Sequence, residues 1–180
     1  MQRTWFCVVL ERQGMMKKIL LLVLGTITSV AASPAQTRPR ESLRGLRGVY
    51  LYVAPVAKEV ETGGLTTVRI RKVAEQALKD AGLEIYSEPQ PPESSANVAI
   101  TIDLVKYSDA AYLYSVNVSV LQEARLVRLP DEGTFPAQTW MAAAFGITGA
   151  HQMSLIIEPL EAKLADFVND FKRANGGARK

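Results

Sequence analysis

Few residues in this sequence have side chains suited to catalysis or metal binding. Its 180 residues include one histidine, His151, and one cysteine, Cys7. A Ser-His-acid triad or a histidine metal site would depend on His151, but such sites need several converging partners. A two-carboxylate site would draw on residues such as Asp103, Asp109 or Glu123, although carboxylates on strands are ordinarily solvated. We therefore expect no catalytic residue, no metal site and no enzyme activity.

Gly63 and Gly64 are the one place where a glycine-rich loop precedes an expected helix. The segment "ETGGLTTVR" has neither the lysine of a phosphate-binding loop nor the glycine spacing of a dinucleotide fingerprint. It predicts a turn, and we expect no cofactor.

The strands that would position any site follow from alternating apolar and polar residues. This pattern predicts five strands, in residues 48–56, 83–88, 97–107, 111–129 and 134–149. Proline and serine in "PQPPESSAN" predict a loop before the third strand, and "PDEG" at residues 130–133 predicts a turn before the fifth. Pro136 indicates that the fifth strand is an edge strand or contains a bulge.

Two amphipathic helices accompany the strands. The first follows Thr66 or Thr67 as its N-cap and ends at Gly82. In the second, from about residue 153, Pro159 predicts either a kink or a main helix that starts near Glu158. Its apolar stripe leaves a polar side that we expect to face water, formed by Glu161, Lys163, Asp166, Asp170 and Lys172.

The order β-α-β-β-β-β-α predicts an α+β fold, a mainly antiparallel sheet of about five strands with two helices on one face. The first β-α-β unit should be parallel. The other face of the sheet is expected to be solvated and to carry Tyr50, Tyr52, Thr101, Asp103, Ser115, Asn117 and Ser119. As a candidate interaction surface we select Tyr50, Tyr52, Tyr107, Asp103 and Asn117, because aromatic rings with a polar edge suit interfaces.

The segment "MMKKILLLVLGTITSVAASPAQT", from Met15, is typical of a secretory signal. A lysine pair precedes an apolar run too short to span a bilayer, and small residues follow. Cleavage is expected after Ala32 or Ala35, so the signal occupies residues 1–35; an uncleaved anchor is the alternative. Translation from Met15 or Met16 would explain residues 1–14. The only cysteine precedes the apolar run, so we expect no lipid attachment and no stable membrane anchor after cleavage.

The rest of the chain is expected to comprise a flexible lead-in (36–46), one α+β domain (47–175) and a disordered tail (176–180). Of 21 basic and 18 acidic residues, four basic and one acidic precede residue 36, which leaves 17 of each. This neutral balance argues against nucleic-acid binding, which needs a clustered basic surface. The arginines of "RPRESLRGLR" are expected to be a solvated leader, with weak membrane-headgroup contact as the alternative.

Beyond the signal, four segments together are the basis of a resemblance to known proteins: "ESLRGLRGVYLYV", "LKDAGLEIYSE", "ANVAITIDLVKYSDAAYLYSVNVSVLQEARLVR" and "LADFVNDFKRAN". With them the chain resembles, over residues 41–175, a group of small uncharacterised exported bacterial proteins. The element order is also similar to that of the lipopolysaccharide-assembly lipoprotein (LptE-like) and of the N-terminal domain of TolB. The resemblance implies an envelope protein, and it supplies no catalytic motif.

Two functions from different classes are consistent with these features. The first is a non-catalytic periplasmic protein that binds an envelope protein, or another copy of itself, through a sheet face or edge. The second is a small-molecule or lipid binder with its pocket between the sheet and the C-terminal helix.

Overall fold

The computed structural model describes residues 40–87, 95–129, 131 and 133–176. Five strands form one sheet: β1 (Gly48–Val53), β2 (Glu84–Tyr86), β3 (Ser95–Ser108), β4 (Ala111–Ala124) and β5 (Phe135–Gly149). The helices are α2 (Lys58–Glu61), α3 (Thr67–Asp80) and α4 (Ile157–Asn175), with 3-10 turns η1 (Arg40–Leu43) and η2 (Met153–Ile156). The predicted signal segment, residues 1–35, lies outside the described residues.

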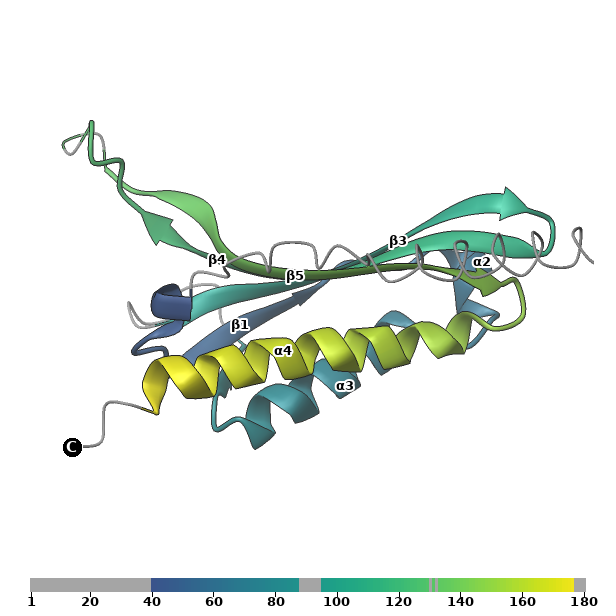
Figure 1. Cartoon of the computed structure of the whole chain (residues 1–180), viewed down its shortest axis with the longest axis horizontal. Helices are drawn as coiled ribbons and strands as arrows, with labels where there is room; N and C mark the ends of the chain where they lie inside the picture. Colours follow the sequence, from purple (N-terminus) through teal and green to yellow (C-terminus); the bar gives the residue numbers. More distant parts are fainter. Residues whose placement is uncertain (1–39, 88–94, 130, 132, 177–180) are drawn as a thin grey trace, which may run out of the picture. The chain divides into compact units, whose positions relative to one another are not determined.

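The strand order in the sheet is β2-β1-β3-β4-β5 (Figure 1). β1 is parallel to β2, as expected for a β-α-β unit, and also parallel to β3. The β3–β4 and β4–β5 pairs are antiparallel and much longer. The predicted fold class is confirmed, and the parallel pairs confined to β1 make the sheet mixed.

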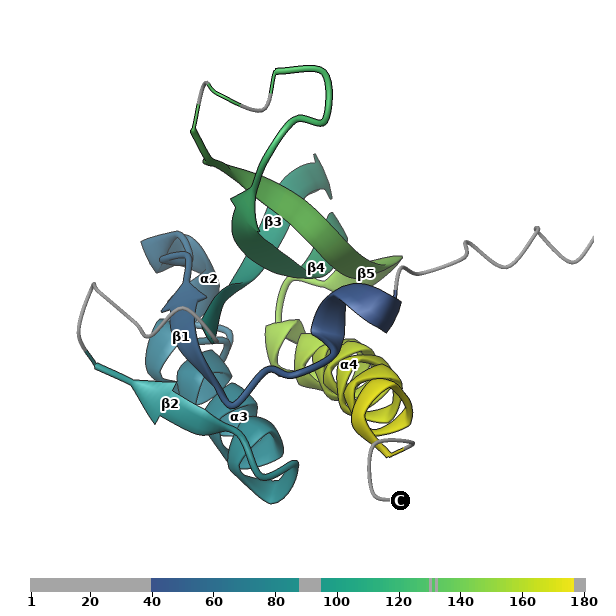
Figure 2. The same ribbon diagram turned by 90° about the vertical axis from the view of Figure 1, so that its left-hand side faces the viewer.

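Both long helices cover the same face of the sheet (Figure 2), α3 against β1 and β2, and α4 against β4 and β5. We call this the inner face and the opposite one the outer face. The largest fully buried side chains come from both layers: Trp140, Phe167, Leu43, Leu65, Ile70, Leu78, Ile100, Met153, Ile156, Leu160, Leu164 and Val49. Among the described residues, no helix combines the length and apolar character needed to cross a membrane.

Local chemistry explains the ends of the helices. Thr66 caps α3, because its hydroxyl accepts a hydrogen bond from the amide of Arg69 at 3.1 Å. Gly82 follows α3 with φ +82°, a left-handed conformation that glycine adopts without steric cost. Pro159 lies in the first turn of α4, where its missing amide would have had no helical partner, so it is compatible with a helix that begins at Ile157, directly after η2.

The structure differs from the sequence prediction at the lead-in and on the polar side of α4. Leu43 and Leu46, expected in a flexible segment, are buried. Asp170, expected to face water, is 4% exposed. It accepts a hydrogen bond from Trp140 Nε1 at 3.1 Å and pairs with Arg40 Nε at 2.7 Å. The η1 turn therefore belongs to the fold, because Leu43 and Arg40 give α4 a neighbour on that side.

Candidate interaction surface

The outer face is built from side chains that the strand register aligns in rows. Residues directly opposite each other in an antiparallel pair point to the same face. Reading across β3, β4 and β5, the rows are Ala99–Ser119–Met141, Thr101–Asn117–Ala143, Asp103–Ser115–Phe145 and Val105–Leu113–Ile147. β1 adds Tyr50 beside Asn97 and Tyr52 beside Ala99.

Polar residues occupy the middle of this face. The Ser115 hydroxyl donates to Asp103 Oδ2 at 3.1 Å, and Asn117 Nδ2 donates to the Ser115 hydroxyl at 3.3 Å. Ser119 donates to the backbone oxygen of Ala99 at 3.4 Å. The predicted pair Asp103 and Asn117 is thus joined through Ser115 in one hydrogen-bonded ladder, whose polar groups suit contact with water or a polar partner.

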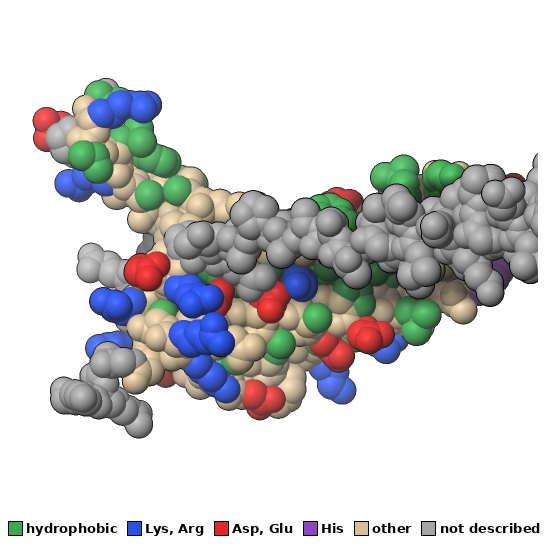
Figure 3. Space-filling view, in the orientation of Figure 1, with side chains coloured by type: hydrophobic (Ala, Val, Ile, Leu, Met, Phe, Trp, Pro, Cys, Tyr) green, Lys and Arg blue, Asp and Glu red, His purple; other side chains and the backbone are tan. Residues whose placement is uncertain are grey.

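Apolar residues occupy the end of the face beyond β1. We call the set Val105, Leu113, Phe145 and Ile147 the distal patch. Their exposed fractions are 63%, 41%, 76% and 65%, although they lie on three adjacent strands. Hydrophobic side chains are visible at the β3–β4 end of the sheet and along the β4–β5 hairpin at the other end (Figure 3), whereas charged side chains of both signs are spread over the helix layer. A contiguous exposed apolar group of this kind marks a contact surface more often than scattered single residues do.

Tyrosines gather at the other end of the outer face. Tyr86 of β2 stands beside Tyr50 in the register, and its ring lies where a side chain on Gly48 would be. Desolvation raises the pKa of the Tyr86 hydroxyl above 10.0, and the Glu84 carboxylate raises it further.

The predicted surface residues fall into separate groups. Tyr50 and Tyr52 lie at the tyrosine end, and Asp103 and Asn117 lie in the middle. Tyr107, 71% exposed, is eight residues beyond Ala99, the partner of Tyr52, and so is about 25 Å further along β3. The three tyrosines therefore do not form one patch, because β1 ends before β3 reaches the distal end.

The predicted surface residues do not include three strongly exposed apolar residues of the outer face, Val105, Phe145 and Ile147. In the sequence Val105 follows Asp103 by two residues, so a regular strand places both side chains on the same face. In β5 an extra residue, Thr139, lies between the partners of Leu121 and Val120, which shifts the alternation and conceals the phase of Phe145.

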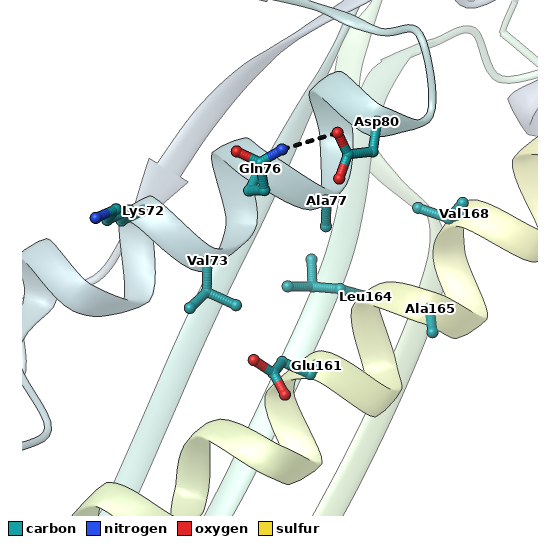
Figure 4. Close-up of a pocket in the computed structure, with 9 residues that line it drawn as sticks. All are labelled: Lys72, Val73, Gln76, Ala77, Asp80, Glu161, Leu164, Ala165 and Val168. Carbon is teal, nitrogen blue, oxygen red and sulfur yellow. Dashed lines mark hydrogen bonds between the residues drawn. The ribbon is translucent and has the colours of Figure 1, made fainter.

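The structure has a groove between its two long helices, which is a different place from the predicted pocket between the sheet and the C-terminal helix. A groove of about 540 Å³ lies between α3 and α4, and its lining residues all belong to these helices. They are Lys72, Val73, Gln76, Ala77, Asp80, Glu161, Leu164, Ala165 and Val168 (Figure 4). Gln76 Nε2 donates to Asp80 Oδ1 at 2.8 Å, so part of the polar rim is internally paired. The floor is apolar, which suits a hydrophobic ligand rather than a charged one.

The residues considered for catalysis do not form one cluster. His151 and Asp109 are next in sequence to Ala150 and Ala110, whose backbone amide and oxygen are 3.0 Å apart at one end of the sheet, whereas Glu123 pairs with Pro136 at the other end. His151 is exposed in the turn after β5, and Asp109 pairs with Lys106 at 2.7 Å in the β3–β4 turn. Within the part of the chain that the structure describes, no three His, Cys, Asp or Glu residues are close enough to hold a metal ion.

No protein-family model and no curated protein matches this sequence. A crystal structure of a minor lipoprotein from Acinetobacter baumannii is similar to 76% of this chain and 95% of its own, with a TM-score of 0.31 and 11% sequence identity. At this TM-score, the likeness carries no argument about function.

Proposed function

We propose that the protein is a non-catalytic, exported envelope protein that binds a protein partner through the outer face of its sheet. The observation that supports this most directly is the distal patch, four exposed apolar side chains aligned across β3, β4 and β5. The hydrogen-bonded ladder of Asp103, Ser115 and Asn117 borders the patch. An apolar centre with a polar rim is the usual composition of a protein interface.

Site-specific photocrosslinking in the native host tests this proposal. A crosslinking side chain at Phe145 should give an adduct with a discrete protein, whereas the same side chain at Val68 should give none. Val68 is the matched control because it is similarly exposed, at 79%, but lies on α3 in the helix layer. Equal adducts at both positions would contradict a specific outer-face contact.

A second pair of variants locates the contact within the face. Replacing Phe145 and Ile147 with serine should weaken capture of the partner, whereas replacing Tyr50 and Tyr52 with serine should weaken it less. Far-UV circular dichroism should show that both pairs remain folded. A larger loss from the tyrosine pair would move the contact to the other end of the sheet.

Export is part of the proposal and has its own measurement. Intact mass of protein recovered from the native envelope should correspond to a chain starting at Ser33 or Gln36. A cytosolic species that retains the apolar run after Lys18 would contradict export.

The groove between α3 and α4 supports one alternative, binding of a small apolar molecule or a lipid chain. Its volume of about 540 Å³ is in the range of ligand sites. Ala165→Phe would place a ring in the groove, and Ala162→Phe is the control because Ala162 is exposed on α4 but does not line it. An apolar fluorescent probe should bind the Ala162 variant and wild type equally and the Ala165 variant less. Equal binding to all three would exclude the groove as the probe's site.

A further inference from the structure

The two edges of the sheet are built differently. β2, at one edge, has three residues and includes the charged Glu84. β5, at the other edge, has fifteen residues, and none of them is Asp, Glu, Lys or Arg. Short length and charged side chains are the usual protection of an edge strand against pairing with another chain. β2 has both forms of protection and β5 has neither.

One end of β5 is already covered by its own chain. The Ser42 hydroxyl of η1 donates to the backbone oxygen of Thr139 at 3.2 Å. Past that point, β4 is the one strand among the described residues that pairs with Met141–Thr148. These eight residues could form a ladder of about 27 Å with another strand.

We infer that a second copy of this chain pairs antiparallel with β5 along Met141–Thr148, about a two-fold axis near Ala144 and Phe145. The inference deepens the proposed function, since it names the partner and places the contact along the β5 edge that borders the outer face. A two-fold axis places the same strand on both sides of the interface. Because this stretch carries no charge, it meets its own copy without like-charge repulsion, which a charged edge would suffer.

The side chains along this stretch fit such self-pairing. With the axis at Ala144, Ile147 of each copy faces Met141 of the other on the outer face, and Phe145 faces Ala143. With the axis at Phe145, the two Phe145 rings face each other. In both registers the Phe145 side chains of the two copies lie opposite or diagonal to each other, so pairing covers part of the apolar surface that Phe145 and Ile147 of each copy alone expose to water.

The inner face of the stretch also permits close approach. Its residues from 142 to 146 are Ala142, Ala144 and Gly146, none of which extends beyond a methyl group. A neighbouring strand therefore meets only methyl groups beside Ala142 and Ala144, while the ring of Tyr114 lies over Gly146.

A charge-swap experiment tests the inference. The protein is produced from the full-length sequence, the recovered species is defined by mass, and sedimentation velocity is measured over a concentration series. Wild type should be a dimer. Phe145→Lys and Phe145→Glu should each raise the dimer dissociation constant at least about tenfold, because like charges meet near the axis. An equimolar mixture of the two variants should restore the dimer, and Val68→Lys should behave as wild type.

Each outcome of this experiment either supports or overturns the proposed dimer. A wild type that is monomeric at every concentration, or a Phe145→Lys variant that dimerises as wild type does, would overturn the inference. Failure of the mixture to restore the dimer, with both variants folded, would overturn the two-fold axis near Phe145. If the crosslinker at Phe145 captures a different envelope protein while the chain is monomeric, the proposed function stands and this inference fails.

Discussion

Two aromatic residues of β5 lie five positions apart and have opposite surroundings. Trp140 is 1% exposed, packs edge-to-face on Phe167 with ring centroids 5.3 Å apart, and donates to Asp170. Phe145 is 76% exposed on the outer face. An odd separation along a strand places two side chains on opposite faces. The inner face thus holds the side chains that stabilise the fold, and the outer face holds those available for contact.

The largest expected difference between the faces concerns buried aromatic packing. Phe167→Ala should lower the free energy of unfolding by about 3–5 kcal/mol, because it removes a fully buried ring that packs on Trp140 and Phe171. Phe145→Ala, the same substitution at the outer face, should change it by about 0.5 kcal/mol or less. Urea unfolding followed by circular dichroism measures both. Equal losses would mean that Phe145 is part of the core.

Buried charge gives the next largest difference. Asp170→Ala should cost about 2–3 kcal/mol, because it leaves Trp140 Nε1 without this acceptor and Arg40 without this carboxylate. Arg40 is half exposed, which keeps the loss below that of a fully buried pair. Asp103→Ala on the outer face should cost about 0.5 kcal/mol or less. Asp170→Asn should lie between them, because its amide oxygen can still accept from Trp140.

The sequence was sufficient to predict most of the framework. Alternation located the strands and placed Leu113 in phase with Ser115 and Asn117 on the outer face, because each side chain in a regular strand points opposite to the one before it. Helical spacing located α3 and α4, and Thr66 and Gly82 marked the ends of α3. These are local features, and local residue chemistry determines them.

The remaining features depend on contacts between distant segments. Asp170 has the helical position of a solvated residue, and Trp140 and Arg40, 30 and 130 positions away, approach it in the fold. The exposure of Phe145 depends on the extra residue at Thr139 and on the edge position of β5. Neither the neighbour order in the sheet nor a bulge can be derived from alternation alone.

A close contact between Gly146 and Tyr114 on the inner face gives a further test of the difference between the two faces. Gly146 is paired with Tyr114, and a methyl group added to Gly146 would lie 2.5 Å from the tyrosine oxygen. Gly146→Ala should therefore cost about 1–2 kcal/mol through overpacking. Adding Tyr114→Leu should recover part of the loss, which a double-mutant cycle in urea would measure. An additive cycle would mean that the ring is not what restricts position 146.

The smallest expected difference in stability between the two faces concerns two hydroxyl groups, those of Thr148 and Ser115. Thr148 is buried on the inner face and donates to the backbone oxygen of Gln152 at 3.0 Å, at the turn that leads into η2. Thr148→Val keeps the shape and removes the donor, so it should cost about 1 kcal/mol. Ser115→Ala removes two hydrogen bonds, but these face water on the outer side, so its cost should be about 0.5 kcal/mol or less.

If the number of hydrogen bonds lost decided the cost, Ser115→Ala would destabilise the protein more. If burial decides it, Thr148→Val destabilises the protein more. If Ser115→Ala proves the more costly, the hydrogen-bonded ladder is a structural support of the sheet, and the outer face cannot be assigned to contact alone. If Thr148→Val is the more costly, burial outweighs bond count, although the Gln152 oxygen would still accept from the amide of Leu155 at 3.0 Å. The second result would extend the division between the faces from aromatic rings and charges to neutral polar groups.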